Sequence, residues 1–210
     1  MGNIRIGIID NQMGNIASVA NAIKSLGLDY VISSSTSKLD PLDSYILPGV
    51  GAFPKAIENF HKNGFERFLE KQVITNSKPF LGICLGMKIL ADSSEEQKVT
   101  KGLGWIPGDV VRIDNQDSYP VPHVGWNNLI YKKQSPLLDS LDDDPNFYFD
   151  HSYEFVAKNN KNVCATCQYG KEISSIISEK NIFGVQFHPE KSQRNGLKVL
   201  RAFTNFTTSK

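Results

Sequence analysis

The first half of the chain alternates short apolar runs with amphipathic segments, and this alternation constrains the fold more than any other feature of the sequence. The apolar runs, which are typical of buried strands, lie at residues 4–9, 30–32, 44–47 and 79–83. Between them, apolar side chains recur at helical spacing within residues 16–26, 53–60 and 65–73. Strands that alternate with helices form a parallel sheet covered on both faces, and functional residues gather where its strands end. We therefore expect an α/β fold built on a central, mostly parallel sheet.

The second half of the chain consists mainly of short strand candidates separated by turn residues, which predicts an antiparallel extension of that sheet. These candidates lie at residues 110–113, 129–131, 147–149, 153–155, 163–167, 174–177 and 182–186. The sequence closes with a helix candidate that carries Leu197, Leu200 and Phe203. The 210 residues contain no internal repeat and no linker rich in Gly, Ser or Pro. We expect residues 1–210 to form a single domain.

The composition argues against several classes of function. The formal net charge is +1, so the overall electrostatics do not draw the chain to nucleic acid or to an anionic membrane. No apolar run approaches the ~20 residues that span a bilayer, and the first residues lack the pattern of a secretory signal. Three cysteines are too few for a disulfide framework, which fits a reducing compartment. We expect a cytoplasmic protein that binds neither nucleic acid nor membrane.

Cys84 lies at a predicted junction between a buried strand, residues 79–83, and a helix that begins at Leu85. Gly82 and Gly86 flank it at two residues on either side, where larger side chains would obstruct a sharp turn. The N–H groups at a helix start favour negative charge, so a thiolate is favoured at this place. The same arrangement presents the nucleophile of serine hydrolases. These residues alone leave two interpretations open, a nucleophile and a buried structural cysteine.

A second motif follows the last strand candidate, where His188 and Glu190 flank Pro189. If His188 reaches Cys84, its imidazole accepts the thiol proton and later protonates a leaving amine. Glu190 then orients the ring and stabilises its protonated form, and Pro189 restricts the backbone between them. A His-Pro-Glu tripeptide is a weak signal by itself, so this interpretation depends on the cysteine at the other strand end.

A third motif, Gly49-Val50-Gly51, lies between a strand candidate and a helix candidate. Its N–H groups, together with the N–H of Leu85, are suited to hold a developing oxyanion. The alternative is an ordinary turn between a strand and a helix. The glycine spacing matches neither a dinucleotide-binding loop nor a P-loop, so no nucleotide cofactor is predicted here.

Cys164 and Cys167 form a Cys-x-x-Cys pair, but they lie in a strand candidate, where residues three apart point to opposite faces. No second cysteine pair accompanies them, so we predict neither a metal site nor redox chemistry. His61 belongs to a surface-type helix. Composition and spacing assign no role to His123 or His151.

Together these motifs resemble those of the class I, or triad, glutamine amidotransferases, whose domain is flavodoxin-like. The resemblance is carried by Pro48-Gly49-Val50-Gly51, by the stretch around Cys84 and by Phe187-His188-Pro189-Glu190. Further segments are similar, in order and over nearly the whole chain, to the glutaminase subunit of imidazole glycerol phosphate synthase. These segments are Gly14-Asn15, Pro122-His123-Val124-Gly125-Trp126-Asn127, His151-Ser152-Tyr153 and Pro189-Glu190-Lys191-Ser192.

The resemblance implies a glutaminase without metal or cofactor. Cys84 attacks the side-chain amide of L-glutamine, His188 protonates the departing ammonia and Glu190 orients His188, after which water hydrolyses the thioester to glutamate. The groups implied to hold the oxyanion belong to Gly49, Val50, Gly51 and Leu85. The residues implied to line the glutamine pocket are Lys88, His151, Ser152 and Tyr153.

The resemblance also implies a partner, a (β/α)8-barrel cyclase subunit that forms a heterodimer with the glutaminase. Ammonia crosses a tunnel to this partner, and the complex, acting as a lyase, makes imidazole glycerol phosphate and AICAR for histidine biosynthesis. The positions that match the subunit interface are Asn15, Trp126, Tyr148 and Lys191. A glutaminase without a second catalytic domain must deliver its ammonia somewhere, so we expect weak catalysis when the partner is absent.

The sequence departs from the family pattern at three places. Lys88 stands four residues after Cys84, where the family usually has a glutamine that helps to hold the substrate. Asn11 and Gln12 alter a loop, and Asp150 replaces a residue that is more often apolar. Two alternatives therefore stay open: a paralogous subunit that feeds ammonia to sugar nucleotides for surface polysaccharides, and a catalytically silent partner subunit.

Overall fold

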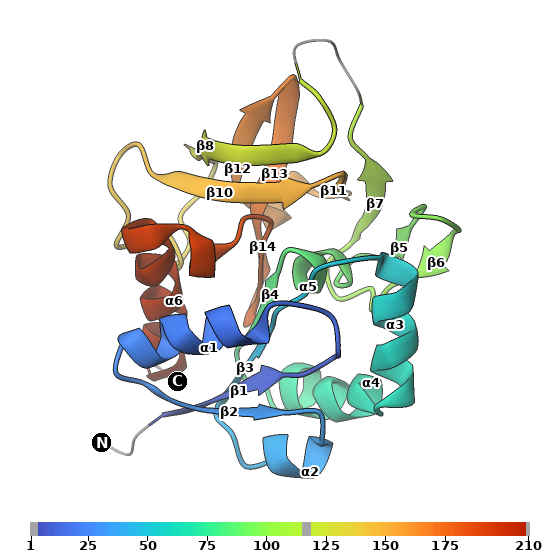
Figure 1. Ribbon diagram of the computed structural model, residues 1–210, viewed down its shortest axis with the longest axis vertical. Helices are drawn as coiled ribbons and strands as arrows, with labels where there is room; N and C mark the ends of the chain where they lie inside the picture. The colour runs from blue at the N-terminus through green and yellow to red at the C-terminus, as the bar shows by residue number, and fades with distance from the viewer. Residues whose placement is uncertain (1–3, 115–118, 209–210) are drawn as a thin grey trace.

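The computed structural model describes residues 4–114 and 119–208, and its centre is an eight-stranded sheet in the order β2-β1-β3-β4-β14-β13-β12-β9 (Figure 1). The first five strands in this order pair in parallel. They are β2 Asp29–Ser33, β1 Arg5–Ile9, β3 Ser44–Leu47, β4 Phe80–Ile83 and β14 Ile182–Val185. This is the strand order of flavodoxin-like folds. The predicted α/β class and its mostly parallel sheet are confirmed.

The antiparallel extension is also confirmed, and part of the second half forms two further sheets. The extension consists of β13 Lys171–Glu179, β12 Val163–Tyr169 and β9 Ile130–Tyr131. A two-stranded ribbon joins β8 His123–Asn128 to β10 Asn146–His151. A four-stranded sheet contains β11 Tyr153–Ala157, β7 Gly108–Arg112, β5 Ser93–Ser94 and β6 Thr100–Lys101.

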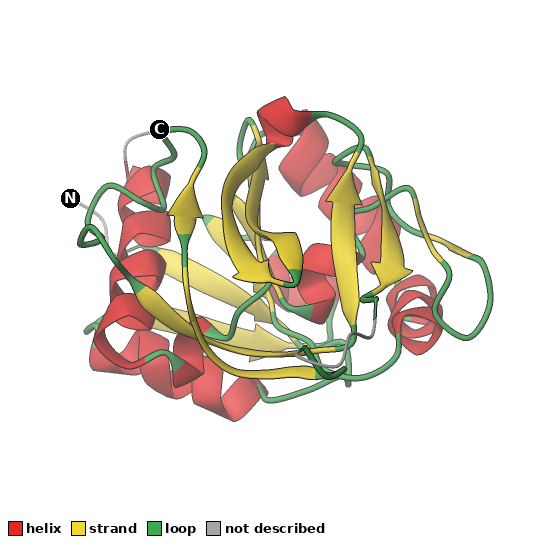
Figure 2. Cartoon of the chain, turned by 90° about the horizontal axis from the view of Figure 1, so that it is seen from above, coloured by secondary structure: helices red, strands yellow, loops and turns green. Residues whose placement is uncertain are grey.

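Helices cover both faces of the central sheet because successive strand side chains point to opposite sides (Figure 2). Ile46 faces the core beneath α1 and α6, whereas its neighbours Tyr45 and Leu47 face the core beneath α3 and α4. The helices are α1 Ile16–Ser25, α2 Thr36–Leu39, α3 Phe53–Lys62, α4 Phe65–Leu69 and α6 Gln193–Thr208. Within the described ranges, none of the helices has the length and apolar character to cross a membrane.

The helix predicted after the cysteine motif is shorter than expected, because α5 covers only Leu85–Lys88. The N–H of Leu103 donates a hydrogen bond to the Ile89 carbonyl at 2.8 Å, so this carbonyl does not accept the next hydrogen bond of the helix. The loop approaches so closely that a Cβ on Gly102 would lie 2.2 Å from the Ala91 carbonyl oxygen. A later segment of the chain therefore ends this helix, and the helical spacing of apolar residues does not reveal such a contact.

Other elements differ from the predictions for local reasons. The helical face predicted for 65–73 continues from α4 into a π-helical turn, Glu70–Thr75. Strand β8 was not expected, because its polar and glycine-containing sequence has low strand propensity and gains its order by pairing with β10. Two 3₁₀ turns complete the elements, η2 Asn160–Asn162 and η3 Pro189–Lys191.

Candidate active site

The sheet order brings the three sequence motifs to one edge. Strand β4 lies between β3 and β14, and all three run in parallel, so their carboxyl ends are neighbours. Gly49 follows β3, Cys84 follows β4 and His188 follows β14. The N–H of Cys84 donates to the Val185 carbonyl at 2.8 Å, which joins the cysteine motif directly to the strand that leads to His188.

Cys84 has the strained backbone of a nucleophile elbow, with φ 53° and ψ −102°. A Cβ on Gly82 would lie 2.3 Å from the carbonyl oxygen of Gly86. A Cβ on Gly86 would lie 2.0 Å from the carbonyl oxygen of Leu47. Both glycines are therefore required by close backbone approach, as the sequence predicts.

We expect Gly86→Ala to lower the free energy of unfolding by about 2–4 kcal/mol, because the new methyl group forces β3 and α5 apart. Urea unfolding of the purified variants measures this loss. Gly27→Ala is the matched control: Gly27 has φ 72° but no atom within 4 Å of the added Cβ, so only about 1 kcal/mol of backbone strain is expected. Equal losses in the two variants would contradict the steric explanation.

The surroundings of the Cys84 sulfur favour the thiolate. Burial raises the pKa of this thiol, but the hydrogen bond with His188 and the charges of Lys88 and His188 outweigh burial, so the pKa lies below its ordinary value. The sequence predicted the same direction from a helix start. Because α5 is a single turn, the imidazole and the Lys88 ammonium are the main reasons instead.

His188 and Glu190 complete a Cys-His-Glu arrangement. Nδ1 of His188 lies 2.9 Å from Oε1 of Glu190, and both side chains are 2% exposed. Burial lowers the pKa of His188, but Cys84 and Glu190 outweigh burial and raise this pKa to about 10. Since Glu190 engages Nδ1, Nε2 is the nitrogen available to exchange a proton with the sulfur. The two pKa shifts together favour a thiolate at Cys84 and an imidazolium at His188.

The predicted oxyanion donors are already hydrogen-bonded in this conformation. The N–H of Leu85 donates to the Gly49 carbonyl at 3.3 Å, and the N–H of Val50 donates to the Met13 carbonyl at 3.2 Å. Gly51, which is exposed and has φ 103°, continues the turn. Carbonyl oxygens therefore occupy the Leu85 and Val50 donors in this conformation, and the role of these groups in holding an oxyanion stays a prediction.

The residues predicted to line the glutamine pocket lie around Cys84. Lys88 ends α5 and His151 ends β10, and these two residues are 5% and 4% exposed. The Lys88 charge contributes to lowering the pKa of both Cys84 and His151, so Lys88 lies near both groups. Ser152 and Tyr153 are partly buried where β10 passes into β11. Cys84, Lys88 and His151 are therefore almost completely shielded from solvent.

Two buried histidines form a hydrogen-bond chain into this pocket. The Tyr153 carbonyl, 3.0 Å from Nδ1 of His151, can only accept, so Nδ1 carries the proton and Nε2 accepts. Nε2 lies 3.0 Å from Nδ1 of His123, which must therefore donate. Asn127 then donates to the remaining nitrogen of His123 at 3.4 Å, and the His123 ring stacks on Tyr169 with centroids 3.9 Å apart. Both imidazoles are neutral.

This chain predicts a loss of stability in mild acid. Burial lowers the pKa of His123 to about 4, and burial is also the largest cause that lowers the pKa of His151 to about 3, from an ordinary value of 6.5. Below pH 6.5 the unfolded chain binds protons that the folded chain excludes, so stability falls as pH falls from 6.5 towards these folded values. The raised pKa of His188 does not offset this fall, because its contribution is fully present below 6.5 and is lost only as pH rises towards 10.

We expect the free energy of unfolding to fall by about 1–3 kcal/mol between pH 6.5 and pH 5. Urea unfolding at the two pH values measures the change. His61→Gln is the control, since that side chain is 55% exposed, and it should keep the same dependence. A stability that is flat across this range would contradict the neutral histidine chain.

Comparisons with known proteins agree on one family. The model of the family described as "Glutamine amidotransferase class-I" matches residues 7–205 of this chain. The imidazole glycerol phosphate synthase subunit HisH 2 of Vibrio vulnificus is 47% identical over 205 residues, which are 97% of this chain and 95% of the relative. The subunit HisH of Sulfurimonas denitrificans is 42% identical over 208 residues, 98% of this chain and 100% of the relative. The chain belongs to the HisH family of class I glutamine amidotransferases.

Solved structures of lower identity share the fold. A crystal structure of a glutamine amidotransferase superposes with TM-score 0.76 at 19% identity and covers 97% of this chain and 98% of that one. The structure of PurLQS from Thermotoga maritima gives TM-score 0.73 at 18% identity, with coverage of 98% and 99%. At these identities the likeness shows a shared fold alone.

Three of the four residues predicted at a partner interface form one cluster in this HisH-family chain. The rings of Trp126 and Tyr148 meet edge to face with centroids 6.1 Å apart, and the Lys191 ammonium lies 5.4 Å from the Tyr148 ring centroid. Trp126 is 47% exposed and Val124, on the same strand, is 53% exposed. Asn15 immediately precedes α1, which packs against η3 beside the cluster.

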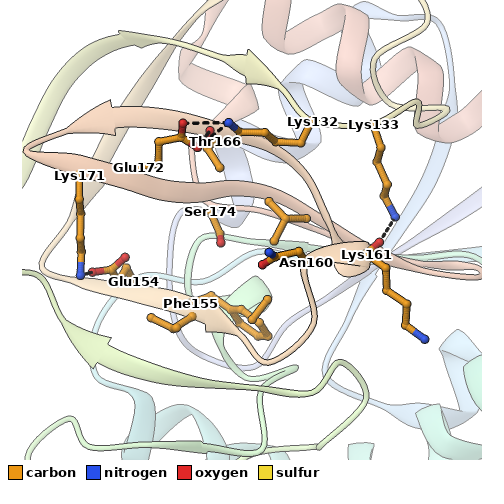
Figure 3. A pocket seen from close by; sticks show the side chains of 13 residues that line it. Lys132, Lys133, Glu154, Phe155, Asn160, Lys161, Thr166, Lys171, Glu172 and Ser174 are labelled. Atoms are coloured by element: carbon orange, nitrogen blue, oxygen red, sulfur yellow. Dashed lines mark hydrogen bonds and ion pairs between the residues drawn. The ribbon is translucent and has the colours of Figure 1, made fainter.

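A cavity of about 630 Å³ lies between β11, β12 and β13, and none of the candidate triad lines it (Figure 3). Two of its four lysines pair with its two glutamates. Lys132 pairs with Glu172 at 2.6 Å, and Lys171 pairs with the buried Glu154 at 2.9 Å. The predicted glutamine pocket of this HisH-family chain is thus separate from the cavity.

The sequence interpretation missed a side chain that donates to the nucleophile. Gln186 is fully buried, and its Nε2 donates to the Cys84 sulfur at 3.6 Å. The available signal was spacing, since Gln186 stands two residues before His188 in an extended segment and therefore shares its side. Cys164 and Cys167, by contrast, are free and fully buried.

Proposed function

We propose that this chain is the glutaminase subunit of an imidazole glycerol phosphate synthase. The proposal rests on the arrangement of Cys84, His188 and Glu190. Nδ1 of His188 lies 2.9 Å from Glu190, and the pKa of the Cys84 thiol is lowered. The names of the HisH relatives point to the same reaction. The substrate is L-glutamine, and the products of this subunit are glutamate and ammonia.

The reaction proceeds through a thioester. The Cys84 thiolate attacks the side-chain carbonyl carbon of glutamine, and the tetrahedral intermediate expels ammonia when Nε2 of His188 supplies the proton. His188, now neutral, accepts a proton from water, which attacks the thioester and releases glutamate and the thiolate. Glu190 keeps the imidazole oriented and stabilises its protonated form throughout.

The oxyanion requires a change in the Gly49–Val50 peptide. The Gly49 carbonyl now accepts from Leu85, and a carbonyl oxygen facing a developing oxyanion would repel it. Turning this peptide frees the Leu85 N–H and directs the Val50 N–H to the site. The low activity expected without a partner follows from the present orientation of this peptide.

Lys88 is proposed to hold the α-carboxylate of glutamine. It is 5% exposed, and among the described residues no carboxylate forms an ion pair with it. A buried cation is costly unless it is paired, and the substrate carboxylate would supply a counter-charge in addition to the nearby Cys84 thiolate. This role would replace the glutamine that the family usually has at the position.

We expect Lys88→Met to raise the KM for glutamine by about 10-fold or more, because a charge-assisted hydrogen bond is lost. Lys88→Gln should raise it less, since the amide retains a donor. Steady-state glutamate release gives KM and kcat separately. A fall in kcat at unchanged KM would assign Lys88 to the thiolate and not to the substrate.

The proposed partner is a (β/α)8-barrel cyclase subunit bound over Trp126, Tyr148, Lys191 and Asn15. The exposed Trp126 and Val124 support an interface there, since large apolar side chains on a surface mark such sites. Glutamate release is to be measured for the chain alone and with added cyclase subunit. Turnover that rises with the cyclase supports the proposal, and absence of glutamate in both cases would favour the silent subunit.

Lys88 also favours a second candidate, a paralogous subunit whose ammonia goes to a sugar nucleotide. Among the relatives, those from Vibrio vulnificus and Methanococcus maripaludis bear the name HisH 2. Formation of imidazole glycerol phosphate by the reconstituted complex distinguishes the two candidates. Glutamate release without that product would favour the second.

A further inference from the structure

The segment after β14 aims two side chains at the Cys84 sulfur. The N–H of Gln186 donates to the Ser175 carbonyl at 2.9 Å, and the N–H of His188 donates to the Tyr148 carbonyl at 2.9 Å, so the backbone is fixed at both residues. The intervening Phe187 points the other way and packs into the aromatic core, its ring stacked on Phe147 with centroids 4.0 Å apart. Gln186 and His188 therefore share the face that looks towards Cys84.

Within the described residues, the Gln186 side-chain amide donates to the nucleophile alone. Nε2 lies 3.6 Å from the Cys84 sulfur, and Oε1 is buried without a hydrogen-bond partner in the described structure. A buried amide that leaves one end unsatisfied is unfavourable for folding, and such groups are found where function requires them. A neutral thiol is a weak acceptor, whereas a thiolate is a strong one. The contact therefore stabilises the charged form of Cys84 more than the neutral form.

The buried side-chain amide of Asn181, at the other end of β14, has a structural role and serves as a comparison. Asn181, also buried, immediately precedes β14, and its Nδ2 donates to the carbonyls of Val73 and Lys78 at 2.9 and 2.8 Å. Those bonds join segments of backbone and touch no ionisable group. Gln186, immediately after β14, makes no such side-chain bond to the backbone in the described structure.

We propose that Gln186 is a thiolate-stabilising donor, which holds the Cys84 sulfur in its ionised form alongside the imidazolium of His188. The proposal rests on the proposed function only in that Cys84 is the nucleophile. It adds Gln186 to the triad of Cys84, His188 and Glu190, and it gives a function to a buried amide that makes no side-chain hydrogen bond to the backbone in the described structure.

The test is the pH dependence of Cys84 alkylation by iodoacetamide, followed at the Cys84 peptide by mass spectrometry in the absence of glutamine. In Gln186→Met, which keeps the length and removes the donor, the pKa of Cys84 should rise by about one unit or more. Gln186→Glu should raise it further, because a carboxylate then faces the thiolate. Asn181→Leu should leave the pKa unchanged and instead lower the free energy of unfolding.

The free energy of unfolding of the Gln186 variants distinguishes a role in stabilising the thiolate from a structural role. Gln186→Met should be at least as stable as the parent in urea, since it removes a buried unsatisfied oxygen. A pKa of Cys84 within about 0.3 units of the parent in both Gln186 variants would overturn the proposal. So would a Gln186→Met protein that is destabilised while its Cys84 pKa does not move. These readouts need no turnover, so a failure here is distinct from a failure of the glutaminase assignment.

Discussion

Cys84→Ala is expected to abolish glutamine hydrolysis, with a loss of more than about 10⁴-fold, because no other group can form the thioester. Glutamate release by the complex with a cyclase subunit measures the loss. The fold should survive the change, since alanine removes only a 4% exposed sulfur.

Cys164→Ala and Cys167→Ala are the matched controls. Both thiols are fully buried, Cys164 lies 3.0 Å from the Ser178 hydroxyl, and burial raises the pKa of Cys167 to about 11, far from a thiolate. Their activity should stay near normal. If all three variants lost activity alike, the loss would reflect misfolding or a different site.

His188→Asn is expected to lower kcat by about 10²–10⁴-fold and to reverse the direction of the Cys84 pKa shift. The imidazolium is a main cause of the lowered thiol pKa, and burial, which raises that pKa, stays in place when the imidazole is removed. The pKa of Cys84 should then rise above its ordinary value of 9.0.

Glutamate release measures kcat, and the pH dependence of alkylation measures the thiol. Lys132, which pairs with Glu172 far from the triad, offers a control: Lys132→Gln should change neither quantity. A Cys84 pKa that stays low in His188→Asn would show that another group holds the thiolate, and it would contradict the ion pair inferred here.

Much of this site is predictable because each motif directly follows a predicted strand of one parallel sheet. Strand–helix alternation indicates a parallel sheet, whose strand ends share one edge, and the motifs meet because β3, β4 and β14 are neighbours. The glycines beside Cys84 are predictable for the same reason, since a sharp turn leaves no room for a Cβ, and the 2.0 Å and 2.3 Å approaches confirm it.

The remaining features depend on tertiary contacts that periodicity does not encode. The end of α5 is set by the Leu103 loop, and the Leu85 donor is occupied because β3 presents the Gly49 carbonyl. The neutral chain of His123 and His151 requires β8 and β10 to pair in one register. Neither histidine has a local pattern that predicts this.

The most direct test of the account is labelling with the glutamine analogue 6-diazo-5-oxo-L-norleucine, followed by mapping of the adduct. A glutaminase that uses Cys84 should take up one analogue at that residue, and glutamine should protect it. Cys164 and Cys167 should stay unlabelled. A folded, partner-bound chain that hydrolyses glutamine but carries no adduct on Cys84, or carries it on another residue, would contradict the central claim.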